Sequence, residues 1–207
     1  MANSDTPFGL RPLRHRNGAP YNGAVNYYYV LAGYATALFL GDPVVKTGTS
    51  NTAGVKIPGA GDFDPGTLPT VNKATAGDGN AITGVVVGVF MDPDDSGAVY
   101  KPASTEAVLA VADDPDLVFE IQDDGAAALA ATSVGLNAVL IYTHAGSTST
   151  GLSGVELDTN SDAPAADASN QLTILRLKPE LGNEIAANAV WEVKINNHSE
   201  AHGAVGL

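Results

Sequence analysis

Apolar and polar side chains alternate most regularly in the middle of the chain, at residues 112–124. There Leu117, Phe119 and Ile121 fall on one side of an extended backbone, and the residues between them fall on the other. A period of two in β-branched and aromatic residues predicts a strand, here over 117–122, with one buried face. Acidic turns flank this segment. We expect the strands before and after it in the sequence to be its neighbours.

Similar apolar runs, separated by Gly, Pro, Asn and Asp, recur along the chain and predict about ten or eleven short strands. The clearest lie at 25–32, 81–90, 107–112, 137–142, 171–177 and 189–196. Gly84 and Gly88 inside the second run indicate a bulge or the close approach of another backbone. Residues 47–80 are expected to form a long loop or a set of very short strands. The sequence therefore predicts an all-β fold, an antiparallel barrel or sandwich of jelly-roll-like or β-tulip-like form.

One short helix is predicted at 126–132, with Asp123 or Asp124 as its N-cap and Gly135 just past its end. Residues 1–20 are interrupted by proline and glycine and are expected to form an extended N-terminal arm. Residues 21–207 then form a β-rich body. This body is either one distorted barrel or two subdomains that divide near 125–135.

The charge of the chain is acidic and unevenly distributed. There are 23 acidic and 10 basic residues, which gives a net charge of −13. Ten of the acids lie at 92–124, while Arg11, Arg14 and Arg16 all lie in the predicted arm. An acidic body repels phosphate groups, so we expect no nucleic-acid partner.

Apolar runs are too short for a membrane-spanning helix or a signal peptide. We therefore expect no membrane partner and synthesis in the cytoplasm. The chain has no cysteine, which excludes disulfides and thiolate chemistry.

Motifs that carry chemistry are weak. Asp92, Asp94 and Ser96 have the spacing of calcium-loop ligands, but the twelfth position, where a glutamate is expected, is Ala103. The acids at 113–124 are better explained as turn formers than as a catalytic pair.

The other candidate residues also favour structural roles. His198 and His202 are four residues apart in a C-terminal tail that we expect to be solvated. Arg176 is expected to pair with an acid, and Trp191 to lie in the core or an interface. We predict no catalytic, cofactor-binding or metal-binding residue, and hence a protein that is not an enzyme.

Six stretches resemble head structural proteins of tailed bacteriophages, of the cement or decoration type. In chain order they are MANSDTPFGLRPLRH, YNGAVNYYYV, ALFLGDPVV, ITGVVVGVF, ADDPDLVFEIQDD and NEIAANAVWEVKINNH. The similarity runs over most of the chain, but the loops at 47–80 and 143–170 carry little of it.

The resemblance implies a structural virion protein on the exterior of an icosahedral capsid, where it cements neighbouring capsomers. It implies a small homo-oligomer, with a trimer favoured, and an N-terminal arm that extends onto the major capsid protein and can add a strand to its sheet. The residues predicted to make this contact are Phe8, Leu10, Arg11, Leu13, Arg14 and Arg16. The arginines would meet acidic residues of the shell.

Two alternatives remain open at this point. A carbohydrate-binding or adhesin-like β module would need an exposed aromatic platform, for which Tyr27, Tyr28, Tyr29 and Tyr34 are the available cluster. Within the phage resemblance, a head-completion or tail structural role is the other.

Overall fold

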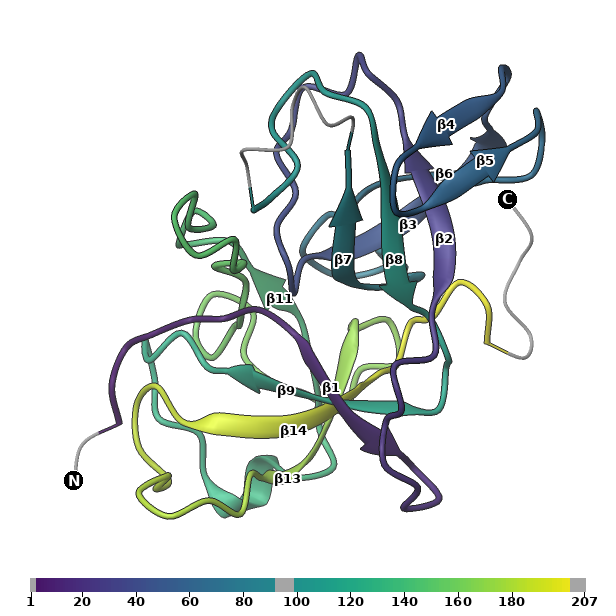
Figure 1. The fold of residues 1–207 in the computed structure, drawn as a ribbon. Coiled ribbons are helices and arrows are strands. Elements are labelled where there is room, and N and C mark those ends of the chain that lie inside the picture. Colours follow the sequence, from purple (N-terminus) through teal and green to yellow (C-terminus); the bar gives the residue numbers. More distant parts are fainter. Residues whose placement is uncertain (1–2, 92–98, 202–207) are drawn as a thin grey trace.

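The computed structural model describes residues 3–91 and 99–201, and its regular secondary structure is almost entirely β-strand, as the sequence predicted (Figure 1). The strands are β1 (Arg11–His15), β2 (Asn26–Val30), β3 (Pro43–Ser50), β4 (Val55–Ile57), β5 (Gly61–Phe63), β6 (Pro69–Lys73), β7 (Gly84–Phe90), β8 (Ala107–Ala112), β9 (Leu117–Gln122), β10 (Asn137–Ala138), β11 (Leu140–Ile141), β12 (Glu156–Leu157), β13 (Leu172–Leu177) and β14 (Val190–Ile195). Ten of them form a closed barrel and a separate five-stranded sheet, which lie in the upper and lower halves of Figure 1. The other four form two antiparallel hairpin-like pairs, β4 with β5 and β11 with β12.

The barrel has the strand order β2-β6-β3-β7-β8 and closes on itself. All its pairs are antiparallel except β2 with β6. Its interior is filled by apolar residues such as Val30, Val44 and Leu109, each 0% exposed. Closure leaves the barrel without the unpaired edges at which other chains could add strands.

The glycines predicted to mark irregularity in β7 do so. The register between β7 and β8 shifts between Val86 and Gly88. A Cβ atom at Gly84 would lie 2.6 Å from the carbonyl oxygen of Ala112, so the two backbones approach too closely there for a side chain. The bulge and the close approach are confirmed.

The second sheet has the order β1-β9-β14-β13-β10 and is antiparallel throughout. Its inner face carries Phe119, Ile121 and Trp191, which are 0% exposed. These side chains share one core with Ile82 and Val85 beside the barrel, so the two parts are packed together. Strand β9 lies inside the sheet, between the edge strand β1 and the central strand β14. The prediction that its neighbours are the strands adjacent in sequence is therefore wrong.

The chain crosses from the sheet to the barrel at 16–25, after β1, and returns to the sheet at 113–116, before β9. All the strands between these crossings belong to the barrel or to the β4–β5 pair. The region 125–135, where a division was predicted, lies instead between two strands of the sheet half. It contains no crossing point between the barrel and the sheet.

The helix predicted at 126–132 is replaced by a bend and a single 3-10 turn, η2 (Ala131–Ser133). Side chains accept from the first backbone N–H groups as a cap would, since Ala126 N donates to Asp124 Oδ1 and Ala127 N donates to Thr159 Oγ1, but no α-helix follows. Seven residues are also too few to form a stable helix without tertiary support.

The C-terminal tail, predicted to fray from His198 onward, is docked as far as residue 201. Ile82 N donates to the carbonyl of Asn197, and Ser199 N donates to the carbonyl of Ile82. His198 is 4% exposed, whereas His202 lies outside the described residues. Among the described residues, no helix has the length and apolar character needed to cross a membrane.

Candidate functional site

The N-terminal residues lie along the edge of the five-stranded sheet. Arg11 to His15 pair with β9 as strand β1, and Leu10 is 1% exposed in the main core. Residues 10–15 are therefore part of the body, which corrects the extended arm predicted for 1–20. The physical reason is burial, because packing the Leu10 side chain in the core of its own chain stabilises the folded protein, whereas an extended arm would leave it exposed to water.

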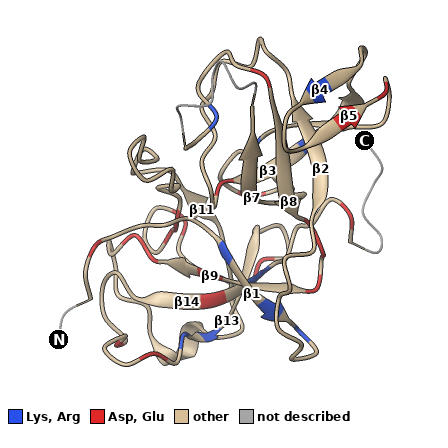
Figure 2. Cartoon of the chain, viewed as in Figure 1, with Lys and Arg blue, Asp and Glu red and all other residues tan. Residues whose placement is uncertain are grey.

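Two of the arginines predicted to contact a capsid are already paired within the chain. Arg11 Nη1 lies 2.9 Å from Glu120 Oε1, and Arg14 Nη2 lies 2.7 Å from Glu192 Oε2. Glu120 and Glu192 face each other on β9 and β14, where Figure 2 shows acidic positions beside the basic positions of β1. Two adjacent buried carboxylates require neighbouring cations, and β1 supplies them. Arg11 and Arg14 thus have partners within the chain, and their contact with a capsid stays a prediction.

Glu192 also binds Arg176 of β13, at 2.8 and 2.9 Å, which confirms that Arg176 pairs with an acid. Burial opposes ionisation of Glu192, but hydrogen bonds from Arg176 and Arg14 outweigh it and lower the pKa of the carboxyl. Lys178 completes the network at 2.5 Å from Glu120 Oε2. Both buried carboxylates of this face are therefore paired with cations of the chain itself.

The other predicted contact residues remain partly accessible. Phe8 and Leu13 are half-buried, and the Arg11 guanidinium lies 4.4 Å from the centre of the Phe8 ring. Arg16 is exposed, and its side chain has no partner among the residues that the structure describes. Phe8, Leu13 and Arg16 can therefore be reached by another molecule, and so can the Arg11 side chain, which is 53% exposed.

Residues 3–6 are fixed by hydrogen bonds rather than free. The side chain of Gln122 donates to the carbonyl of Ser4 at 2.7 Å and accepts from Thr6 N at 2.9 Å. The Asn3 side chain donates to the carbonyls of Glu184 and Ala187. The N-terminal segment is thereby tied to the 178–189 loop.

The 178–189 loop holds a well-defined shape and presents apolar side chains to solvent. Asn183 binds the carbonyls of Lys178 and Val190 and accepts from Val190 N, so its amide closes the loop. Leu181 is 103% exposed and Ile185 is 49% exposed. No pattern in the sequence indicates this surface, because Leu181 and Ile185 follow neither a strand period nor a helix period.

A shallow cavity of about 230 Å³ separates this loop from the N-terminal segment. Residues of both segments line it, among them Ser4, Phe8 and Leu181. Phe8 and Leu181 line the cavity, and Ile185 is exposed on the same loop; we call these three residues and the cavity the loop surface.

The tyrosines do not form the shared platform that a glycan-binding module would need. Tyr28 and Tyr29 are 4% and 8% exposed, and their hydroxyls donate to Asp113 and Glu106. The Tyr34 hydroxyl accepts from Lys73 N. Tyr27 is 37% exposed but packs edge-to-face against Phe63.

The acids at 113–124 have structural partners, as expected of turn formers. Asp114 Oδ1 accepts from Asp116 N, and Asp123 Oδ2 accepts from the indole N–H of Trp191 in the core. The calcium-like residues Asp92, Asp94 and Ser96 lie outside the described residues.

Sequence reasoning missed one cluster, formed by Asp5, His144 and Glu156. His144 Nδ1 lies 2.7 Å from Glu156 Oε2, and this hydrogen bond raises the pKa of His144. The pairing of β11 with β12 could have indicated the His144–Glu156 contact, but nothing in the sequence places Asp5 there.

No protein-family model, no curated protein and no solved structure matches the chain.

Proposed function

We propose that this chain is a structural protein of a tailed-bacteriophage head, which binds the outer surface of the capsid and cements neighbouring capsomers. The proposal rests on the resemblance of six sequence stretches to such proteins and on one structural observation. That observation is the loop surface, where apolar side chains are held exposed on a hydrogen-bonded loop. A rigid loop that exposes apolar groups is typical of a contact surface.

The major capsid protein is the proposed partner, and the loop surface replaces the arginines as the proposed contact. Its position agrees with the resemblance, because it includes Phe8 of the N-terminal segment. Many copies on one shell would strengthen a modest contact through avidity. The net charge of −13 would favour solubility of the free protein and weaken any binding to DNA.

The experiment is co-sedimentation of the purified chain with capsids that lack it. We expect stoichiometric binding by the natural chain and binding weakened at least about tenfold by the double substitution Leu181→Ser and Ile185→Ser. Burial of one such side chain contributes about 1.5–3 kcal/mol, which corresponds to roughly 10- to 150-fold in affinity. Leu31→Ser is the matched control, since Leu31 is 51% exposed beside the barrel strand β2.

Deleting residues 1–20 would not be a clean test, because it removes strand β1 and Leu10 from the fold. Mass measurement of the free protein would test the proposed trimer.

Absence of capsid binding by the natural chain, together with affinity for glycans, would favour the carbohydrate-binding alternative. Equal binding by the double variant and the control would exclude the loop surface.

A further inference from the structure

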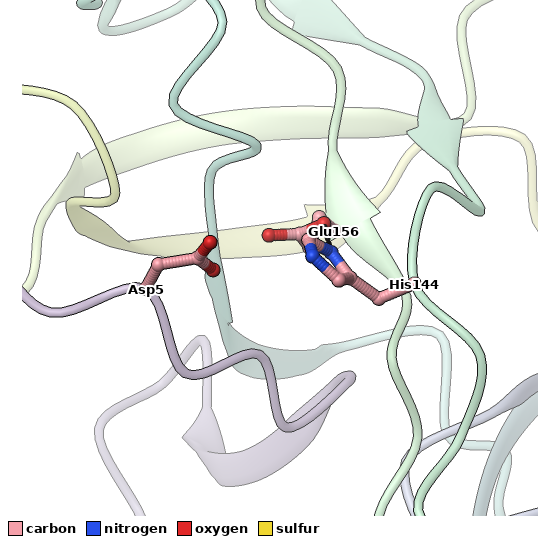
Figure 3. Close-up of side chains that lie close together, drawn as sticks. All are labelled: Asp5, His144 and Glu156. Atoms are coloured by element: carbon pink, nitrogen blue, oxygen red, sulfur yellow. Dashed lines mark hydrogen bonds and ion pairs between the residues drawn. The ribbon is translucent and has the colours of Figure 1, made fainter.

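Asp5, His144 and Glu156 come from distant parts of the sequence and meet beside the N-terminal segment (Figure 3). One ligand atom from each lies within 4.8 Å of the other two. Glu156 belongs to β12, His144 follows β11, and Asp5 belongs to the N-terminal segment. Two carboxylates and an imidazole provide the oxygen and nitrogen donors that divalent transition metals accept.

A second, independent feature points to a ligand, because Glu156 is only half satisfied. The side chain is 0% exposed, and its Oε2 accepts from Thr143 Oγ1 at 2.7 Å and contacts His144. Its Oε1 has no hydrogen-bond partner among the described residues. Figure 3 shows an oxygen of Glu156 directed toward Asp5. A buried carboxylate oxygen that lacks a donor is costly, and a cation would remove that cost.

The backbone holds all three residues in place. Gln122 binds Ser4 and Thr6, the two neighbours of Asp5 in the chain. On the other side, a Cβ atom at Gly154 would lie 2.6 Å from the carbonyl oxygen of His144, so only glycine permits this close approach. The site is therefore positioned by its surroundings and not by flexible side chains alone.

We propose that Asp5, His144 and Glu156 bind one divalent transition-metal cation, best matched by Zn²⁺, which fastens the N-terminal segment to the β11–β12 pair. Donor atoms around a tetrahedral zinc ion are about 3.3–3.6 Å apart, so the present arrangement needs shifts of roughly 1 Å. Such shifts are accessible, because Asp5 is exposed and the His144 side chain is 46% exposed. Water from this open side completes the coordination. This inference does not depend on capsid binding.

The test is isothermal titration of the untagged full chain with ZnCl₂ near neutral pH. We expect one equivalent to bind and the affinity to fall at least about 100-fold in His144→Ala, since partners outside the coordination shell already account for 10–100-fold. Asp5→Asn is the variant least able to disturb the fold, and we expect at least a tenfold loss from it. Zinc should also slow proteolytic cleavage near Asp5 in the natural chain but not in Asp5→Asn.

The matched controls are His15→Ala, which removes a histidine from β1, and Asp62→Asn, which removes an exposed carboxylate on β5. Both should bind zinc as the natural chain does. Absence of stoichiometric binding would overturn the proposal. So would binding that Asp5→Asn and His144→Ala leave unchanged, because the ion would then lie elsewhere.

Discussion

Replacing Lys101 by methionine tests whether a buried ammonium group governs stability in alkaline solution. Lys101 is 0% exposed, and its Nζ donates to the carbonyl oxygens of Tyr34 at 2.9 Å and Thr36 at 3.1 Å. The Tyr34 ring centre lies 4.9 Å away. Burial lowers the pKa of Lys101 from 10.5 to about 8.

The lowered pKa of Lys101 fixes both the sign and the size of the effect. Between pH 8 and 10.5 the unfolded chain carries a proton on this lysine that the folded chain lacks. Raising the pH through this window therefore favours the folded state. The difference between 10.5 and about 8, at ~1.36 kcal/mol per pH unit, sets an upper limit of ~3.4 kcal/mol. Methionine fills a similar volume and has no charge to lose.

The assay is urea unfolding of the natural chain and Lys101→Met at several pH values from 7.5 to about 10.5. The stability of the natural chain should rise relative to that of the variant by up to ~3.4 kcal/mol across this range. Lost hydrogen bonds contribute an offset that varies little with pH, and the tyrosines with raised pKa values, such as Tyr142, cancel because both proteins share them. Lys56→Met, at a side chain 81% exposed, should show no such slope. A constant difference between the natural chain and Lys101→Met would refute the reasoning.

Two further predictions concern the junctions of the fold. Gly9→Ala should destabilise the chain by at least about 2 kcal/mol more than Gly18→Ala in urea unfolding. Both glycines have positive φ, but the new Cβ at Gly9 would lie 2.6 Å from the Gly41 carbonyl, whereas nothing lies within 4 Å at Gly18; equal losses would contradict this. The imidazole of His198 should titrate below pH 6.5 by NMR, because burial lowers its pKa despite the nearby acids Asp113, Asp114 and Glu200. Its contribution to stability is then lost as the pH falls below about 6.5, and a midpoint at or above 6.5 would exclude this account.

The sequence predicted the strands because the alternation of apolar and polar residues in a strand is a local pattern that can be recognised without knowing its neighbours. Ala107–Ala112 coincides with the predicted 107–112, and Leu117–Gln122 with 117–122. Pairing partners were less accessible to sequence reasoning. Both faces of β9 are buried, not one, because Glu120 and Gln122 are covered by N-terminal residues more than 100 positions away. An edge strand contributed from such a distance leaves no local signal.

The same limit explains the candidate site. Arg11 and Arg14 are part of a basic cluster in an acidic chain. Their position in the sequence does not indicate that they pair with Glu120 and Glu192, which are more than 100 residues away. The loop surface depends on the hydrogen bonds of Asn183 and on the exposure of Leu181 among the described residues, and a hydrophobicity pattern can show neither.

The ion pairs also determine how the N-terminal segment can meet a partner. Releasing it to add a strand elsewhere would expose Leu10, which costs about 1.5–3 kcal/mol. It would also remove Arg14 from the buried Glu192, which would keep only Arg176 as its partner. The outer edge of β1 is partly occupied as well, since His15 N donates to the Ala19 carbonyl and Tyr21 N donates to the Leu13 carbonyl.

If this segment added a strand to a partner's sheet, the free energy of the new contacts would first have to offset these costs. Binding through a preformed surface incurs neither cost and loses little conformational entropy. The proposed capsid contact is therefore better made by Phe8, Leu181 and Ile185 as they stand. Hydrogen exchange at residues 10–15 should then be as slow in the free protein as in the capsid-bound one, and marked protection gained on binding would argue for release and re-pairing instead.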